Sequence, residues 1–338
     1  MSAGRARKEQ TSGVYEIIAD VCVDEGLSLS SKPQYKLAIG TFVQVVDIKA
    51  STEEERLRGR LESGGWISLL NTTNKKTWVR PLRPGTFVVT CNSLIVTRGI
   101  SLSSEKVGVF GLDEYIEVVE LRYVRKDRRV RGKIFSGGYV SLVNTKRSFS
   151  GAEPVHLGAY ITVSKSDISK DFKSCPLKTL ETGTYIDITE TIYDPEGKCL
   201  RGKLSNGSWT TLEDKKIGRR TAIPIPLGTY QTHEHLLYIH KQASLTSKGG
   251  AMLDGESFID VIETKFVSNN NEVRGRLASG GWIILLDTKT NYKFSRPVQS
   301  GVYFTCNETL AVSTAAILNS KPLRVMLPYT PTEVVETR

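Results

Sequence analysis

The chain has 338 residues, of which 39% are hydrophobic and 24% are charged. This composition excludes a disordered chain, and no apolar run approaches the ~18 residues that a membrane-spanning helix needs. Lys and Arg number 46 against 36 Asp and Glu, and the resulting charge of +10 is compatible with an acidic partner without requiring one. Residues 1–12 form a basic tail, and no apolar stretch follows its first charges, so we expect no secretory signal.

An internal repeat organises the rest of the chain. A segment of Arg, Gly, a basic residue and an aliphatic residue recurs at spacings of 73, 70 and 73 residues, and an aromatic residue follows each of its glycines by seven positions. Length alone predicts two or three domains at roughly 100–200 residues each, whereas this periodicity predicts four repeats and one half repeat. The boundaries are 13–84, 85–157, 158–227 and 228–300 for the four repeats and 301–338 for the half repeat with the C-terminal tail.

Each repeat has the pattern of β structure throughout. The stretches 42–46, 115–119, 185–189 and 258–262 are rich in β-branched and aromatic residues with polar residues between them. No window of a dozen residues shows a helical period, and Gly and Pro interrupt the chain every 8–15 residues. We therefore predict an all-β protein, a tandem array of small β-barrels that dock on one another because ~70 residues bury only a modest core.

The Arg-Gly segment and the aromatic residue after it form a predicted hairpin. Side chains alternate along a strand, so Arg58 and Arg60 share its outer face, and the turn at 63–65 brings Trp66 to the side of Arg60. Two interpretations stay open: the ring closes the barrel end or the joint between repeats, or the four rings line equivalent grooves for a ligand. The candidate partner-binding residues are Trp66, Tyr139, Trp209, Trp282, Arg60, Lys133, Lys203 and Arg276. The acids expected to neutralise the Arg of each Arg-Gly segment across the sheet are Asp47, Glu120, Glu190 and Glu263.

The order of these features resembles the bacterial-type Src-homology-3-like (SH3b-like) repeat family. The resemblance covers residues 13 to about 325 and joins a Leu-x-Leu-Ser-Ser-x-Pro motif, a Gly-x-Phe-Val-x-Val motif and a Gly-Gly-Trp-Ile-x-Leu motif. It implies a small barrel of five or six strands and a binding function without catalysis, commonly for cell-wall glycopeptide or protein segments. In the first repeat it rests on Leu27, Leu29, Pro33, Gly40, Val43, Val45, Gly65, Trp66 and Leu69.

No catalytic constellation emerges from the sequence. His233, His235 and His240 lie close together, but no further Cys or His completes a metal site nearby. The five Cys are scattered without a Cys-x-x-Cys motif, which is typical of a reducing compartment, and no Gly-rich segment opens a helix as a phosphate-binding loop does. We therefore expect no enzyme activity, no cofactor and no metal, and an intracellular, cytoplasmic location.

The loop before the Arg-Gly segment distinguishes the repeats. It is acidic at 51–56 in the first repeat and strongly basic in the second. Tyr123 and Tyr139 accompany its cations, a mixture that suits stacked bases, and Lys146 and Arg147 extend the charge if the barrel closes as expected. The alternative is a solvated loop that only aids solubility. The candidate anion-binding residues are Arg122, Arg125, Lys126, Arg128, Arg129 and Arg131.

Three functions follow from these features. The first is a scaffold that binds a protein partner through the aromatic-plus-basic grooves of tandem SH3-like barrels. The second is binding of nucleic acid or another polyanion through the basic loop of the second repeat, and the third is binding of carbohydrate or a cell-wall polymer, which the resemblance alone implies. The half repeat at 301–338 either caps the fourth repeat or mediates association, and the sequence leaves the oligomeric state open.

Overall fold

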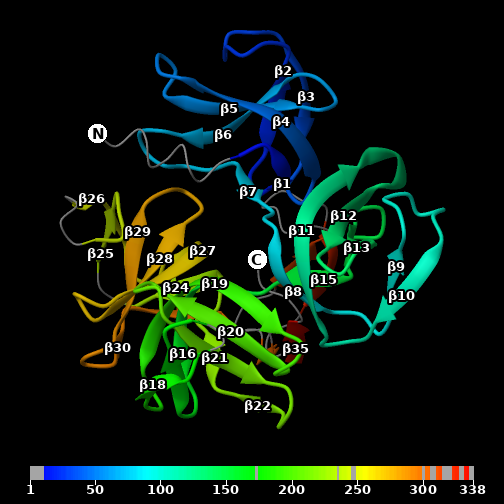
Figure 1. Ribbon diagram of the computed structural model, residues 1–338. Coiled ribbons are helices and arrows are strands. Elements are labelled where there is room, and N and C mark those ends of the chain that lie inside the picture. Colours follow the sequence, from blue (N-terminus) through cyan, green and yellow to red (C-terminus); the bar gives the residue numbers. More distant parts are fainter. Residues whose placement is uncertain are drawn as a thin grey trace. The chain divides into compact units, whose positions relative to one another are not determined.

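Antiparallel β-strands dominate the computed structural model, as the alternation of β-branched and polar residues predicts (Figure 1). The model describes residues 11–171, 174–233, 236–244 and 249–298, together with the backbone of four strands between 301 and 334. Within these ranges the one helical element is the 3₁₀ turn η1 (Arg125–Asp127). The prediction of an all-β fold of tandem repeated units is confirmed, because four antiparallel sheets each draw their strands from a single predicted repeat.

The chain separates into two compact units. The first contains repeats one to three, through Ile225, together with the short segments Lys265–Ser268 and Ala278–Gly281. The second contains the remainder of repeat four and the residues that follow it. In the part of the chain that the structure describes, no helix is long and apolar enough to cross a bilayer.

The sheet of repeat one shows the plan that the other repeats follow. Its strand order is β3-β2-β6-β5-β4-β1-β7, and the central meander β4-β5-β6 carries the Arg-Gly segment on β5. The stretch 42–46 noted in the sequence opens the long strand β4. The strands of this sheet are β1 (Gly13–Ile17), β2 (Val21–Asp24), β3 (Pro33–Leu37), β4 (Phe42–Ser51), β5 (Arg56–Leu61), β6 (Trp66–Asn71) and β7 (Val79–Pro81).

Repeats two, three and four have the same order with one further short strand each, which pairs with the strand equivalent to β6. Repeat two contains β8 (Gly85–Val89), β9 (Leu94–Thr97), β10 (Lys106–Phe110), β11 (Tyr115–Val124), β12 (Arg129–Ile134), β13 (Tyr139–Asn144), β14 (Phe149–Ser150) and β15 (Ala152–Pro154). Repeat three contains β16 (Gly158–Thr162), β17 (Ser166–Ser169), β18 (Pro176–Leu180), β19 (Tyr185–Asp194), β20 (Cys199–Leu204), β21 (Trp209–Asp214), β22 (Arg219–Arg220) and β23 (Ala222–Pro224).

Repeat four contains β24 (Gly228–Thr232), β25 (Leu237–His240), β26 (Gly249–Leu253), β27 (Phe258–Val267), β28 (Glu272–Leu277), β29 (Trp282–Asp287), β30 (Tyr292–Lys293) and β31 (Ser295–Pro297). In the half repeat, β32 (Gly301–Phe304) pairs with β35 (Pro331–Val334). A second pair joins β33 (Leu310–Ser313) to β34 (Pro322–Met326). The side chains of the half repeat lie outside the described residues, so its predicted role stays a prediction.

The glycine of each Arg-Gly segment lies where core side chains press against the strand. A Cβ at Gly59 would lie 2.9 Å from Leu69 Cδ2 and 3.0 Å from Val45 Cγ1. The same two-sided contact recurs at Gly132, Gly202 and Gly275. Glycine therefore recurs because the core of each repeat closes over the middle of this strand and leaves no room for a methyl group.

Consecutive repeats of the first compact unit share their cores. Val14 belongs to the buried cluster of repeat two, and Phe42 and Leu82 pack against the same cluster. In the same way Tyr115 and Val155 of repeat two pack against the core of repeat three. Each repeat thus covers the core of the next, which is how units of about 70 residues add to the small core that each can bury alone.

A backbone hydrogen bond recurs at these joints. The Tyr123 amide donates to Gln44 Oε1 at 3.1 Å, and the Tyr193 amide donates to Glu117 Oε1 at 2.8 Å. Within the first compact unit the Phe266 amide donates in the same way to Asp187 Oδ1 at 3.2 Å. The acceptor is a side chain near the start of the long strand, and the donor lies near the end of the long strand of the following repeat. Successive repeats are therefore joined in the same register each time.

Candidate binding surfaces

The predicted aromatic–basic pairs face one another across the hairpins. Arg60 lies directly opposite Trp66 on the paired strands β5 and β6, and the equivalent pairs recur in the other three sheets. Trp209 is only 8% exposed, whereas the other three aromatic side chains are half-buried. The ring is thus almost fully buried in repeat three and partly exposed in the other three repeats. The other pairs are Lys133 with Tyr139, Lys203 with Trp209, and Arg276 with Trp282.

The cation over each ring differs between repeats. Lys203 Nζ lies 5.5 Å from the centre of the Trp209 ring, as the pattern predicts. In repeat one the cation is instead Lys49, 5.6 Å from the Trp66 ring, while Arg60 is exposed. Lys49 lies on the neighbouring strand β4, so its contact follows from sheet pairing and not from the Arg-Gly motif.

In repeats three and four the repeated acid pairs with the second basic residue of the segment, whereas Asp47 pairs with Lys49 and Glu120 with Arg122. Lys203 forms a 3.0 Å ion pair with Glu190, and Arg276 forms a 2.6 Å ion pair with Glu263. Asp47 and Glu120 occupy the same register positions opposite Arg60 and Lys133. In repeat one the expected partner, the first arginine Arg58, pairs with Asp24 instead of Asp47.

The first arginine of the segment is buried in repeats one, two and four, while Arg201 in repeat three is partly exposed. Arg58 is 0% exposed, and Arg131 and Arg274 are almost equally enclosed, so the face that Arg58 shares with Arg60 is covered at Arg58 and exposed at Arg60. Arg131 is therefore no part of the exposed basic surface to which the sequence assigned it.

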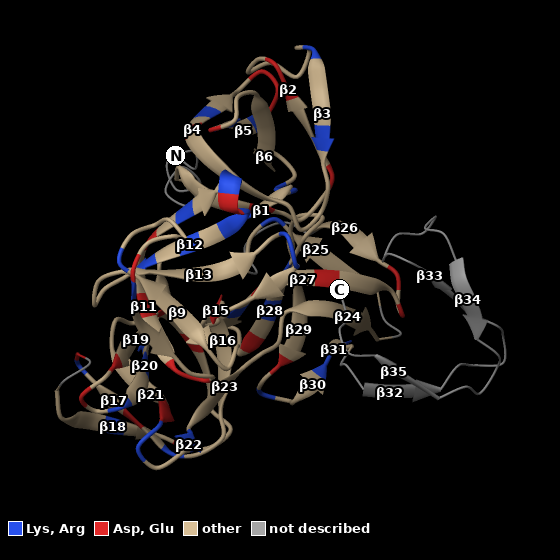
Figure 2. Ribbon diagram, turned by 90° about the vertical axis from the view of Figure 1, so that its right-hand side faces the viewer, with Lys and Arg blue, Asp and Glu red and all other residues tan. Residues whose placement is uncertain are grey.

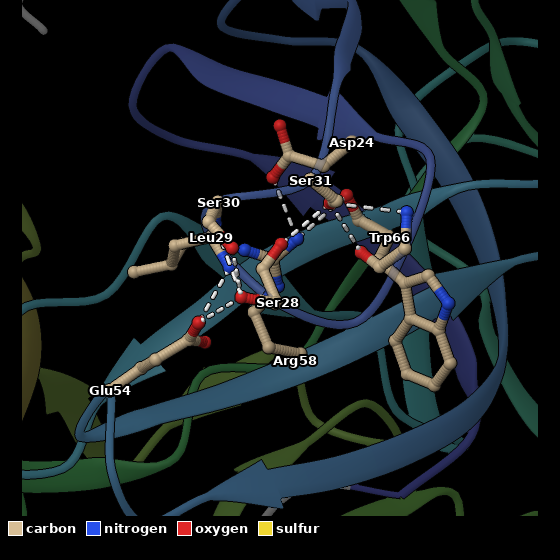
Figure 3. Close-up of polar contacts among 9 residues, drawn as sticks. Asp24, Ser28, Leu29, Ser30, Ser31, Glu54, Arg58 and Trp66 are labelled. Carbon is tan, nitrogen blue, oxygen red and sulfur yellow. Dashed lines mark hydrogen bonds and ion pairs between the residues drawn. The ribbon is translucent and has the colours of Figure 1, made fainter.

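Arg58 ties three segments of repeat one together (Figure 3). Its Nη2 donates to Asp24 Oδ2 at 2.7 Å and to the Trp66 carbonyl at 3.2 Å. Figure 3 shows its guanidinium among Asp24, the Trp66 backbone and the serine-rich turn at 26–31. Its Nε and Nη1 atoms are buried without a hydrogen-bond partner in the described residues. The charge is thus held in place chiefly by Asp24 and the hairpin carbonyl.

The equivalent arginine of repeat two has neutral partners. Arg131 donates to the hydroxyls of Thr97 and Ser141 and to the carbonyls of Ile100 and Tyr139. Burial lowers the pKa of Arg131 from its ordinary value. The first position is Arg in all four repeats, whereas the second varies between Arg and Lys. Because Lys cannot replace the several donors of a buried guanidinium, this difference is the signal in the sequence that could have distinguished the first position from the more exposed second position.

The acidic loop of repeat one also has a structural partner. Glu54 Oε1 accepts hydrogen bonds from Ser28 Oγ at 2.6 Å and from the Leu29 amide at 2.7 Å. These two hydrogen bonds lower the pKa of the Glu54 carboxyl. The loop therefore fastens the serine-rich turn in its place (Figure 3).

The cations of repeat two gather at one end of its sheet, at the β11–β12 connection and the turn after β13 (Figure 2). The two segments are joined because the amide and the hydroxyl of Thr145 both donate to the Arg128 carbonyl at 3.0 Å. Arg129 is half-buried, and burial followed by the nearby charge of Arg147 lowers its pKa. We name this surface the basic end of repeat two: Arg125, Lys126, Arg128, Arg129, Lys146 and Arg147.

Most of these charges have no counterion. Among the described residues no carboxylate lies within ion-pair distance of Arg125, Lys126, Arg128, Lys146 or Arg147, all of which are exposed. Arg122 differs, because it lies 3.8 Å from Glu120 on the same strand. The structure therefore brings four of the six predicted anion-binding residues together, pairs Arg122 with an acid and buries Arg131.

An exposed apolar surface on repeat two was missed by the sequence reasoning. Strand β10 forms the edge of its sheet (Figure 1), and Val109 on it is 61% exposed opposite Ile95 on β9, which is 41% exposed. The corresponding edge strands β3 and β18 begin with Pro33 and Pro176, each of which lacks a backbone N–H to donate, whereas β10 contains no proline, and neither does β26 of repeat four. We name this surface the β9–β10 face: Ile95, Leu102, Val107, Val109 and Leu112.

The His and Cys residues that the sequence offered as metal ligands or reactive groups are the remaining candidates. In the ranges that the structure describes, no group of three His, Cys, Asp or Glu side chains is placed to hold a metal ion. His235 and Cys306 lie outside those ranges, and Cys22, Cys91, Cys175 and Cys199 are free thiols. No protein-family model matches this chain, and no curated protein sequence matches it.

Proposed function

We propose that the chain is an interaction scaffold whose second repeat binds an extended segment of a protein partner. The observation that carries this proposal is the β9–β10 face, an apolar surface beside an open sheet edge. A peptide strand that pairs with β10 satisfies backbone groups along the edge, and alternate side chains of that strand reach Val109 and Ile95. Exposed apolar patches next to such an edge are typical of binding sites. The aromatic–basic pairs supply further contacts in this proposal.

Capture of partners from the native cell tests the proposal. A Val109→Lys variant places a charge on the open edge without touching the core, because Val109 is exposed. We expect proteins that the wild-type chain captures, identified by mass spectrometry, to be lost with V109K and kept with Leu177→Lys. Leu177 is the matched control, since it is 72% exposed on the equivalent edge strand β18. Equal capture by V109K and the wild type contradicts the proposal.

A second candidate function is binding of a polyanion such as single-stranded nucleic acid at the basic end of repeat two. The observation that favours it is the group of exposed cations without counterions described above. Each phosphate that a cation neutralises releases counterions, so the affinity falls as the salt concentration rises. Arg129 is half-buried and lies close enough to Arg147 for the two charges to interact, so positive charge is concentrated at this point of the surface.

A salt titration with a labelled single-stranded oligonucleotide tests this candidate. Reversal of Arg125, Lys126 and Arg128 to Glu is expected to flatten the slope of log affinity against log salt by about 2, at roughly 0.7 per charge. Reversal of Lys32, Lys36 and Lys178, which are exposed elsewhere, changes the net charge equally and is the control. No binding at low salt, or equal loss in both triple variants, removes the polyanion function.

A further inference from the structure

An exposed aromatic ring lies in the basic end of repeat two. Phe149 is 48% exposed on the short strand β14 and lies opposite Asn144 on β13. Asn144 lies in turn opposite Arg129 on β12, so three neighbouring strands place these residues in one row. Residues directly opposite one another in antiparallel strands face the same side of the sheet. The Phe149 ring and the Arg129 side chain are therefore on one face, about 10 Å apart at two strand spacings.

Two turns of cations adjoin this row. Lys146 and Arg147 lie in the turn between β13 and β14, and the Lys146 amide donates to Oδ1 of the buried Asn144 at 3.2 Å. The connection between β11 and β12 supplies the other cations and is joined to the first turn at Arg128. The acid of that connection, Asp127, has its Oδ2 atom buried. A ligand on this face therefore meets an aromatic ring and exposed positive charge together.

The two tyrosines that the sequence associated with these cations are placed differently. Tyr123 packs against the core of repeat two, and its amide is bound to Gln44 of repeat one. Tyr139 begins strand β13, whereas the basic end adjoins Asn144 at the other end of that strand. Five residues along a strand separate the two ends by about 17 Å. The exposed ring at the basic end is therefore Phe149, which the sequence reasoning did not single out.

The equivalent rows of the other repeats lack this combination. Repeats three and four have an aspartate where repeat two has Asn144, and repeat one has Lys76 at the position of the ring. Tyr292 of repeat four is 42% exposed, but the two residues beside it in its row are carboxylates. An exposed ring and an arginine in one row, with a neutral residue between them, are thus found in repeat two. The other rows are Cys199, Asp214 and Arg219 in repeat three and Glu272, Asp287 and Tyr292 in repeat four.

The ring distinguishes between the anions that the cations would attract. The face of an aromatic ring is the negative part of its quadrupole, so a bare phosphate or carboxylate gains nothing from lying over it. A nucleic-acid base has a π face of its own and stacks on such a ring while its phosphates lie on neighbouring cations. In a duplex those base faces are already stacked on each other. The surface therefore suits a single strand better than a duplex, a polyphosphate or an acidic peptide.

We propose that the basic end of repeat two binds single-stranded nucleic acid, with one base stacked on the Phe149 ring and the adjoining phosphates on Arg129, Arg147 and their neighbours. This inference rests on the polyanion function proposed above, and it adds the class of ligand and the residue that recognises the base. Because every base has a π face, the stacking favours no particular sequence.

A comparison of two strands of equal charge tests the inference on the full chain. The probes are a labelled oligothymidylate and an abasic strand of the same length, which have the same phosphates and therefore the same electrostatic contribution. We expect the wild type to bind oligothymidylate at least about 5-fold more tightly than the abasic strand at one salt concentration. Phe149→Leu keeps an apolar side chain without a π face and is expected to remove this preference, while Phe149→Trp keeps it.

Two exposed rings provide matched controls. Tyr292→Ala removes the ring at the equivalent position of repeat four, and Phe135→Ala removes one from the β12–β13 turn, at the opposite end of those strands. Both are expected to keep the wild-type preference, and F149L is expected to leave the affinity for the abasic strand unchanged.

The possible failures are distinguishable. No binding of either strand at low salt removes the polyanion function and this inference with it. Equal affinity of the wild type for the two strands, or an unchanged preference in F149L, overturns the stacking and leaves the polyanion function standing. Polyglutamate of equal charge that binds as tightly as oligothymidylate indicates an acidic protein segment as the ligand and also overturns the inference.

Discussion

The carboxylate of Glu117 in the second repeat accepts a 2.8 Å hydrogen bond from the backbone amide of Tyr193 in the third. Burial raises the pKa of Glu117, while the hydrogen bonds from Tyr193 and Thr86 oppose that rise. Repeat one has Gln44 at the same position, and its amide oxygen accepts the Tyr123 amide. The joint therefore requires an acceptor oxygen there and not a charge.

Replacement of Glu117 separates these two contributions. Glu117→Gln keeps the acceptor and removes a buried charge, so we expect it to change the stability of the joint by less than about 0.5 kcal/mol or to raise it. Glu117→Leu leaves the Tyr193 amide without its acceptor and is expected to cost about 1–3 kcal/mol. Hydrogen exchange of amides in β11 and β19 measures both, and equal costs for the two variants contradict this reading.

The glycine of the Arg-Gly segment is expected to be required for packing. A Cβ at Gly202 would lie 2.8 Å from Leu212 Cδ1 and 2.9 Å from Ile188 Cδ1, so Gly202→Ala is expected to cost about 1–3 kcal/mol. Gly108→Ala is the control, because its Cβ would meet Val96 at an ordinary 3.8 Å. Urea unfolding compares the two variants, and a harmless G202A refutes the packing explanation.

The buried ion pair of repeat one gives a third prediction. Asp24→Ala leaves Arg58 buried without its counterion, so we expect a loss of about 3–5 kcal/mol. The double variant Asp24→Leu with Arg58→Met removes both charges and is expected to be much less damaged. Hydrogen exchange in β5 and β6 reports on this repeat, and a D24A variant that loses less than the double variant contradicts the argument.

A fourth prediction concerns pH. Burial lowers the pKa of His156 to about 4 from its ordinary value of 6.5. Between these values the unfolded chain binds a proton that the folded chain does not, so the contribution to stability is full above pH 6.5 and is lost as the pH falls toward 4. The loss is no more than about 3 kcal/mol at 1.36 kcal/mol per pKa unit.

A His156→Gln variant isolates this effect. The variant lacks the titrating group, so its urea midpoint is expected to fall less steeply than that of the wild type between pH 6.5 and 4. Above pH 6.5 the two slopes should agree, because His156 is neutral in both the folded and the unfolded chain there. Parallel curves across the whole range show that His156 is not the group responsible.

The recurrence of Arg58, Gly59 and Trp66 at fixed spacing was enough to predict the all-β class and the repeated sheets. Strand periodicity and turn residues act over a few positions, so they are readable in the sequence. The same local pattern does not reveal that Arg58 is buried, because the side chain that pairs with its guanidinium is Asp24. Asp24 is 34 positions away, and local alternation carries no information about it.

The sequence by itself thus determined the repeated strands, the hairpin that pairs Arg60 with Trp66, and the accumulation of cations in the loop of repeat two. Tertiary structure alone decided which cations are free, since ion pairs and burial depend on neighbours from other strands. It also decided that Phe258 is open while Tyr115 is covered. Two residues in equivalent positions of a repeat have the same local pattern, so only their neighbours in the tertiary structure decide which of them is covered.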